Sequence, residues 1–325
     1  NTSFTGVITE DGFKGAEEGF VGIMAVSDPD MKVGVFGMPK EGTARETGHK
    51  VAVEALKRAG TTAAPAFFYM SAPSGEEEYY LKGITEVIGR IPFFGGSAAD
   101  NAIAGDWLLY TDEMVTADGV SVAFFYTDKP FANKFTGAYR ETANAGVITK
   151  IDGDRTLVEI NGVPALEQYR RWTGASAEEV SGGNLLAYAV QKPLAVKDRL
   201  GDLAAIRHPM NGNVDGSMNI GNNLAVGTAV IQMEADVDEI IAAVGKTLED
   251  LKKKIGKPIA GLHLVHCGGR RAGIGDRIDE VTAQVKNAVG DVPFIMEFTF
   301  GEYGYEDDGN NTCGGLMLSF TAFGE

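Results

Sequence analysis

The sequence is poor in the residues that build metal sites and disulfide frameworks. Among 325 residues there are 2 Cys and 4 His. Cys267 and Cys313 lie too far apart for the C-x-x-C spacing of zinc sites. The histidines are scattered, and His263 and His266 would point to opposite faces of one strand. We therefore predict no metal site. Two free thiols in a reducing cytosol are the simplest interpretation, with a disulfide between them as the alternative.

Long apolar runs and an excess of positive charge are also missing. No stretch approaches the roughly 18 uninterrupted apolar residues of a membrane span, and residues 1–4 do not resemble a signal peptide. Lys and Arg number 29 against 45 Asp and Glu, which gives a formal net charge of −16. A chain with this charge repels phosphate backbones and anionic lipid. We therefore expect no nucleic acid and no membrane as a partner, and a cytoplasmic location.

What the sequence does contain is one layout that occurs twice. In the first copy, the apolar run 65–70 leads through a glycine-marked loop and a helix to Ile91-Pro92-Phe93. In the second copy, the run 259–265 leads in the same way to Val292-Pro293-Phe294, 201 positions later. The length also fits about two domains. The duplication predicts two similar units whose loops form one cleft.

Apolar residues at spacings of three and four predict five helices. Asp236 caps a helix that ends before Gly256, and Ser74 with Glu77 forms a capping box for a helix that ends before Gly89. The other three helices are expected over 45–59, over 163–172, and from the loop 266–271 to about 289.

Short apolar runs predict a larger number of strands, several of which follow one another directly. Asp152-Gly153-Asp154 is typical of a hairpin turn. The fold class is therefore α/β (α+β), with mixed, partly antiparallel sheets flanked by helices. Because no repeat unit precedes the apolar run at 22–26, we expect a further β-loop-α segment before Asn1. The strands are predicted at 22–26, 119–126, 146–151, 156–160, 185–190, 224–231 and 316–321.

Three loops carry residues that suit a small ligand. In the loop 267–271, Arg270 or Arg271 can grip a carboxylate or phosphate, although both can also form ordinary surface ion pairs. The loop 95–101 offers small residues with polar groups that suit an ammonium or hydroxyl, or an ordinary turn and cap. In the segment 301–312, Glu302 directly follows a strand, and the acidic residues after it resemble a solvated turn more than a calcium site.

Several stretches together resemble the FIST domain family, which has an N and a C segment. The order and spacing of these stretches carry the resemblance: 2–6, 94–101, 160–166 with Tyr169, 266–270, 300–302 and 311–312. By this resemblance, residues 1–140 form the FIST N-like segment, without its first strand and helix, and residues 141–325 form the FIST C-like segment. The resemblance also implies two similar, interwoven subdomains.

The resemblance further implies an intracellular sensory module of bacterial or archaeal signalling systems. Small ligands such as amino acids have been proposed for it, and the output passes through a signalling partner protein. We expect a ligand carboxylate on Arg270 and its ammonium near Asp100 or Glu302, in a cleft that closes on binding. The predicted ligand-binding residues are Gly96, Ser97, Asp100, Asn101, Cys267, Arg270, Arg271, Glu302 and Asn311.

The sequence predicts no catalytic residue and no cofactor. Two alternatives stay open beside the sensor. Cys267 next to His266 could be the nucleophile of an enzyme. Some members of the family are described as haem-bound nitric oxide sensors, but none of the four histidines stands out as an axial ligand.

Overall fold

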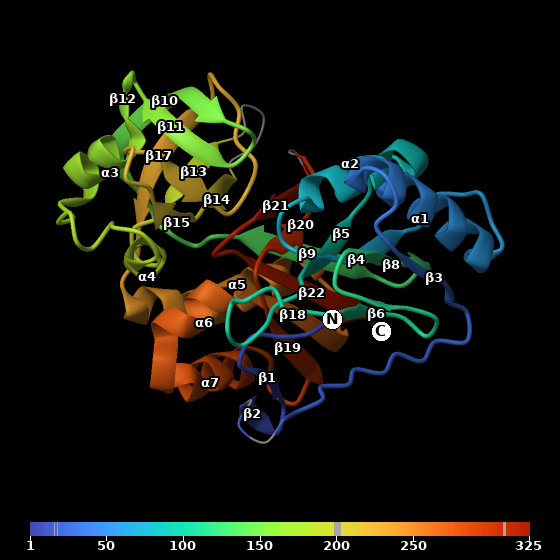
Figure 1. The fold of residues 1–325 in the computed structure, drawn as a ribbon. Helices are drawn as coiled ribbons and strands as arrows, with labels where there is room; N and C mark the ends of the chain where they lie inside the picture. Colours follow the sequence, from blue (N-terminus) through green and yellow to red (C-terminus); the bar gives the residue numbers. More distant parts are fainter. Residues whose placement is uncertain (16, 18, 198–202, 308–309) are drawn as a thin grey trace.

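The first repeat forms a six-stranded sheet, called here the first sheet. The computed structural model of the chain describes residues 1–15, 17, 19–197, 203–307 and 310–325. Within the first sheet, two parallel strands are connected by α2 (Glu77–Ile88), and α1 (Ala44–Ala59) lies beside α2 (Figure 1). The strand order is β21 (Thr312–Gly314), β20 (Glu302–Gly304), β5 (Phe93–Ser97), β4 (Phe67–Ala72), β8 (Gly119–Tyr126) and β3 (Lys32–Pro39).

The second repeat forms another six-stranded sheet, the second sheet, with the same pattern of parallel and antiparallel neighbours. Its parallel pair is connected by α6 (Gly268–Ile274), a 3-10 turn (Gly275–Arg277) and α7 (Ile278–Val289), and α5 (Val237–Ile255) packs beside α7. The strand order is β2 (Gly12–Gly15), β1 (Gly6–Thr9), β19 (Phe294–Thr299), β18 (Ile259–Cys267), β22 (Leu318–Gly324) and β9 (Phe131–Thr136).

The two sheets exchange strands, which confirms the predicted interweaving. β20 and β21 follow the second repeat in sequence but extend the first sheet beyond β5. In return, β1 and β2 precede the first repeat but extend the second sheet beyond β19. Each sheet is therefore completed by a hairpin from the other half of the chain.

The sheets face each other through aromatic side chains, with the helices outside. Phe67 on β4 stacks on Phe131 on β9, with ring centroids 3.9 Å apart, and Phe94 on β5 lies 6.0 Å from Phe323 on β22. The opposite faces of the two sheets are buried by α1 and α2 and by α5, α6 and α7, respectively (Figure 1). This is a four-layer α/β/β/α arrangement, in which alternation along each strand sends one side chain to the helices and the next to the other sheet.

A third, antiparallel sheet is inserted between β9 and α5 and lies to one side of the other two (Figure 1). It carries the short helices α3 (Ala165–Thr173) and α4 (Asn184–Ala189). A separate two-stranded ribbon consists of β6 (Leu109–Tyr110) and β7 (Val115–Thr116). The third sheet has the order β14 (Ala204–Arg207), β13 (Leu194–Lys197), β17 (Ala229–Glu234), β10 (Arg140–Asp152), β11 (Thr156–Ile160), β16 (Met218–Ile220) and β15 (Pro209–Gly212), with β12 (Val163–Pro164) on β11.

The end signals of the helices are confirmed in part. Asp236 and Glu239 form a capping box at the start of α5, and Gly256 ends the helix in the left-handed conformation. The capping box expected from Ser74 and Glu77 is wrong, because α2 begins after Glu76 without a side-chain cap and the Glu77 carboxylate accepts the Gly75 N–H instead. Among the described helices, none has both the length and the apolar composition needed to cross a membrane.

Three predicted elements differ from the structure. Residues 22–26 form no strand, because this segment crosses the space between the first two sheets and has no strand beside it to pair with. The run 185–190 is helical over α4, where Leu185 and Ala189 share one buried face. The strand expected at 224–231 begins only at Ala229. In addition, the helix expected up to 289 is interrupted at Gly275, whose φ of +59° ends α6.

The third sheet is fastened to the first repeat by a buried ionic cluster. Arg155, in the hairpin turn between β10 and β11, lies 2.9 Å from the carboxylate of Glu77 and 2.6 Å from that of Glu78, in the first turn of α2. Its Nη1 also donates to the carbonyl of Gly221, at 2.6 Å. Glu77 is fully buried, so Arg155 is the cation that compensates a carboxylate removed from water.

Replacing Arg155 by Met is expected to destabilise the fold by about 3–5 kcal/mol, because Glu77 would stay buried without its cation. Urea denaturation measures the loss. The control is Arg140→Met, which breaks ion pairs of a side chain that is 59 % exposed and is expected to cost less than about 1 kcal/mol. Glu77→Gln in the Arg155→Met background should recover part of the stability. An equal loss with and without Glu77→Gln would contradict this account.

Candidate functional site

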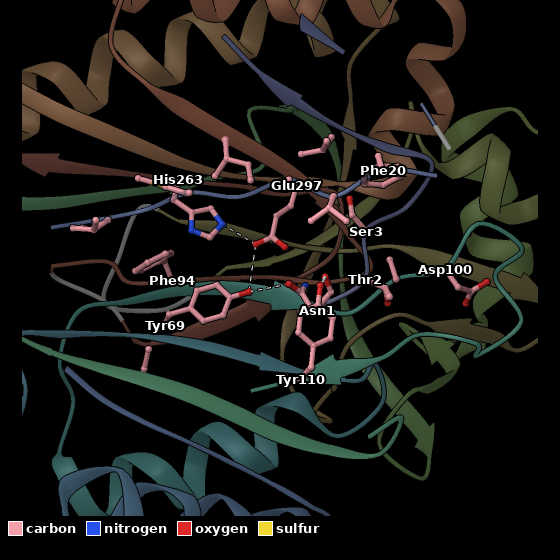
Figure 2. A pocket seen from close by; sticks show the side chains of 18 of the residues that line it. Asn1, Thr2, Ser3, Phe20, Tyr69, Phe94, Asp100, Tyr110, His263 and Glu297 are labelled. Atoms are coloured by element: carbon pink, nitrogen blue, oxygen red, sulfur yellow. Dashed lines mark hydrogen bonds and ion pairs between the residues drawn. The ribbon is translucent and has the colours of Figure 1, made fainter. Parts of the chain in front are cut away.

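A cavity of about 850 Å³ lies between the first and second sheets. This volume is within the range of small-molecule sites. β4 contributes Phe67 and Tyr69, which alternate with Phe68 and Met70 on the helix-covered face. The same alternation on β18 and β19 turns His263 and Glu297 into the cavity (Figure 2). Further lining comes from Asn1, Thr2, Ser3, Val7, Phe94, Ala99, Asp100, Asn101, Ala102, Asp106, Tyr110, Ala123, Phe125, Ile295 and Phe323.

One side of the cavity is covered by an irregular segment, residues 19–31, called here the strap. Phe20, Val21 and Met24 of the strap are among the residues that line the cavity, and Val21 and Ile23 are 84 % and 80 % exposed. Among the described residues, the backbone groups of 19–27 form no hydrogen bond with another backbone group. Apolar side chains therefore hold the strap in place, and its outer face carries apolar residues as well.

The polar centre of the cavity is Glu297. Its Oε1 lies 2.9 Å from Nε2 of His263 and accepts a hydrogen bond from the Tyr69 hydroxyl at 3.4 Å (Figure 2). The Tyr69 hydroxyl also donates to the side-chain oxygen of Asn1 at 3.1 Å. The imidazole of His263 stacks on the Tyr69 ring, with centroids 5.5 Å apart, and meets Phe94 edge to face. His263 of the second sheet and Tyr69 of the first sheet thus converge on the carboxylate of Glu297.

This environment keeps Glu297 ionised. Burial alone would raise the pKa of Glu297, but the hydrogen bond and charge of His263 lower it, so that the pKa lies below its usual value. The pKa of Tyr69 is raised well above 10 by burial and by the charge of Glu297. The centre of the cavity therefore presents the negative charge of Glu297 and the protonated phenol of Tyr69 to whatever enters it.

Two of the nine predicted ligand-binding residues, Asp100 and Asn101, line this cavity. The Asp100 carboxylate accepts backbone N–H groups of Ala102, Ala104 and Gly105 at 2.9–3.0 Å. The side-chain oxygen of Asn101 accepts the N–H of Thr5 at 2.7 Å. Asp100 thus shapes its own loop, and Asn101 ties that loop to Thr5. Both side chains accept backbone N–H groups, the capping role that the sequence left open as the alternative to ligand binding.

Gly96, Ser97 and Glu302 are brought together, but not at this cavity. Gly96 on β5 pairs with Glu302 on β20, and Ser97 Oγ lies 2.7 Å from the Tyr303 hydroxyl. The Glu302 carboxylate is fully buried and accepts the Thr299 hydroxyl at 2.9 Å and the Met317 N–H at 2.8 Å. The end of β5, with Gly96 and Ser97, and β20, with Glu302, are therefore neighbours in the first sheet.

Arg270 and Cys267 lie in the protein interior close to Leu316. The Arg270 guanidinium donates to the carbonyls of Gly137 and Ile240, at 2.7 and 2.9 Å, and more weakly to that of Leu316. The Cys267 sulfur accepts the N–H groups of Gly269 and Leu316. Burial raises the pKa of Cys267, which keeps the thiol protonated. Both cysteines are free.

The last two predicted residues also have partners within the fold. Arg271 donates to the carbonyl of Gly275 at 2.9 Å and lies over the ring of Phe13. Asn311 donates to the carbonyl of Ile91 at 3.0 Å. Neither is among the residues that line the cavity. A ligand role for Arg271 and Asn311 stays a prediction. The same holds for the other predicted residues outside the cavity, which are Gly96, Ser97, Cys267, Arg270 and Glu302.

The residues that the sequence did not single out are Tyr69 and Glu297. Their signal was present: each is a polar residue within a mostly apolar strand, and Glu297 is the one acidic residue of β19. Such a charge in a buried strand needs a partner from another element. His263 was considered only as a haem or metal ligand. Its partner is a carboxylate, and no group of ligating side chains that could hold a metal ion exists among the described residues.

Comparison with known families gives two adjoining matches. Residues 2–163 match the FIST N domain, and residues 165–305 match the FIST C domain. A search of curated proteins finds no match.

Glu302 provides a test of how the interior around Arg270 is arranged. Burial raises the pKa of Glu302 to about 8, although the Met317 N–H and Thr299 hydroxyl oppose the shift. The stability that protonated Glu302 contributes is fully present below the unfolded pKa, about 4.3, and is lost as the pH rises through 8. We expect wild type to lose stability between pH 6 and pH 8, relative to Glu302→Gln, by up to about 1.4 kcal/mol per pH unit.

The amide of Glu302→Gln can keep both hydrogen bonds, since its oxygen can accept the Met317 N–H and its nitrogen can donate to the Thr299 hydroxyl. Chemical denaturation at pH 6 and pH 9 measures the difference. Parallel pH profiles for the two proteins would show that Glu302 is ionised in the folded state at neutral pH.

Proposed function

Because the chain belongs to the FIST family, whose domains are sensors of signal transduction and not a family of enzymes, we propose that it binds a small molecule in the cavity between its first two sheets. The observation that carries the proposal is the cavity itself. It is walled by aromatic side chains of both sheets and has one buried carboxylate at its centre. Apolar walls with a few fixed polar groups are typical of ligand sites.

The position of the cavity supports a sensing role. A molecule bound there contacts β4 and β5 of the first sheet, β18 and β19 of the second sheet, and the strap. It therefore changes the free energy of any movement of one sheet against the other, or of the strap against both. A signalling protein that reads such a movement would be the partner. Amino acids, the ligands implied by the resemblance, are the first compounds to test.

The alternatives have less support. An enzyme with Cys267 as nucleophile would need a thiolate, whereas Cys267 is buried and has a raised pKa. For a haem, His263 is the histidine that lines the cavity, but its Nε2 lies 2.9 Å from Glu297. The described cavity lining also contains no Lys or Arg to pair with haem propionates. The residues present therefore do not fit a haem.

Filling the cavity should abolish binding without unfolding the protein. Ala123 on β8 lies opposite Tyr69 in register and lines the cavity, so Ala123→Phe should occupy the space of a ligand. We expect any amino acid or amine that raises the melting temperature of wild type to bind this variant at least about tenfold more weakly. Thermal-shift and calorimetric titrations measure both quantities.

The matched control is Ala283→Phe, at an exposed position of α7, which should bind as wild type does. Equal affinity of wild type and Ala123→Phe for the same compound would place the ligand elsewhere. Failure of every amino acid and amine to bind wild type would count against an amino acid sensor.

The strap should respond to the ligand. Since the backbone of residues 19–27 has no backbone partner among the described residues, its amides should exchange with solvent within seconds in the free protein. A ligand packed against Phe20 and Met24 should slow this exchange about tenfold or more, while the amides of β4 change little. Hydrogen exchange followed by mass spectrometry tests this. Unchanged exchange in the strap with a bound ligand would exclude it as the moving element.

A further inference from the structure

The charges of the cavity point to the class of ligand. Its described lining contains three carboxylates, Glu297, Asp100 and Asp106, and no Lys or Arg. Asp100 is engaged by the three N–H groups of its own loop, and Asp106 is exposed to solvent. Glu297 is 8 % exposed and lies on a strand in the interior of the second sheet. A ligand carboxylate near Glu297 would meet a like charge in a site of low dielectric, whereas an ammonium would be attracted.

Glu297 has capacity for such a partner. His263 and Tyr69 both contact the same carboxylate oxygen, Oε1. Figure 2 shows the other oxygen pointing away from both of them, toward the side of the cavity where Ser3 lies. An ionised carboxylate can accept about four hydrogen bonds, so further donors can be accommodated.

The surroundings of Glu297 suit the remainder of such a ligand. The ring of Tyr69 lies beside the carboxylate, Phe94 packs against Tyr69 and His263, and Phe20 and Tyr110 also line the cavity (Figure 2). Aromatic faces attract cations and stack on flat apolar groups. A carboxylate set among aromatic rings therefore selects for a positive nitrogen carried on an apolar body.

We propose that the ligand of this cavity is a protonated amine on a flat, apolar body, with its ammonium on Glu297 and its body among the aromatic side chains. The proposal rests on the proposed function, since it names the ligand class of the same site. It differs from the expectation that a ligand carboxylate binds Arg270. The described lining of the cavity contains no Lys or Arg to pair with a carboxylate, and Arg270 donates to backbone carbonyls in the interior. A zwitterionic amino acid would gain the contact with Glu297 but leave its own carboxylate without an ionic partner.

Three compounds that share one aromatic body separate these possibilities. Tyramine carries only the ammonium, tyrosine carries ammonium and carboxylate, and 3-(4-hydroxyphenyl)propionate carries only the carboxylate. Calorimetric titration of the wild-type chain is expected to rank them in this order, with tyramine binding at least about tenfold more tightly than the acid.

Glu297→Gln is the diagnostic variant, because the amide keeps the shape and an oxygen for His263 but loses the charge. It is expected to weaken tyramine binding about 30-fold or more and to leave the acid unaffected or bound more tightly. The control is Glu249→Gln, at an exposed position of α5 outside the cavity lining, which should change tyramine affinity less than about threefold. If Glu297→Gln does not fold, Glu297→Asp is tested in its place. This variant keeps the charge but withdraws it by one methylene, so it should also weaken tyramine binding.

The outcomes separate this inference from the proposed function. Equal affinity for tyramine and the acid, no binding of tyramine to wild type, or unchanged tyramine binding to Glu297→Gln would each overturn the amine class. The cavity would still be the ligand site if another compound bound wild type but not Ala123→Phe. If tyramine bound wild type and Ala123→Phe equally well, both the inference and the proposed site would be wrong.

Discussion

The contact between the two sheets is the constraint on which the rest of the structure depends. Stacked and tilted rings of Phe67, Phe94, Phe131 and Phe323 join β4 and β5 of one sheet to β9 and β22 of the other. Large aromatic side chains bury much apolar surface and hold sheets at a distance set by their size. Where the rings give way to smaller residues such as Ala123, the spacing that they impose leaves the cavity. The same interface therefore holds the halves together and provides the space for a ligand.

The sequence predicted the architecture well, because its signals are local. The recurrence of an apolar run, a helix and a Pro-Phe strand identified the two repeats, and Asp236 with Gly256 marked both ends of α5. The elements that were mistaken depend on distant partners. The run 185–190 has the apolar content of a strand but forms α4, which packs on β15, and residues 22–26 lack any strand to join.

The candidate site was harder to predict for a related reason. Sequence reasoning favoured charged residues in glycine-rich loops. In the structure, the side chains of Arg270 and Arg271 instead form hydrogen bonds with backbone carbonyls of the protein itself. Arg270 ties the backbone after β9 to α5 and to the turn before β22, so that its positive charge organises the junction of three segments. The cavity is instead lined by single positions of strands from opposite ends of the chain. Tyr69 and Glu297 are 228 residues apart, and only the stacking of the sheets brings them together.

The exchange of hairpins has a consequence for how such a protein can be divided or joined to others. A cut between the two family segments would leave β5 without β20 and β19 without β1, and each fragment would present an unprotected sheet border prone to aggregation. The two family segments must therefore be inherited and transplanted as one piece.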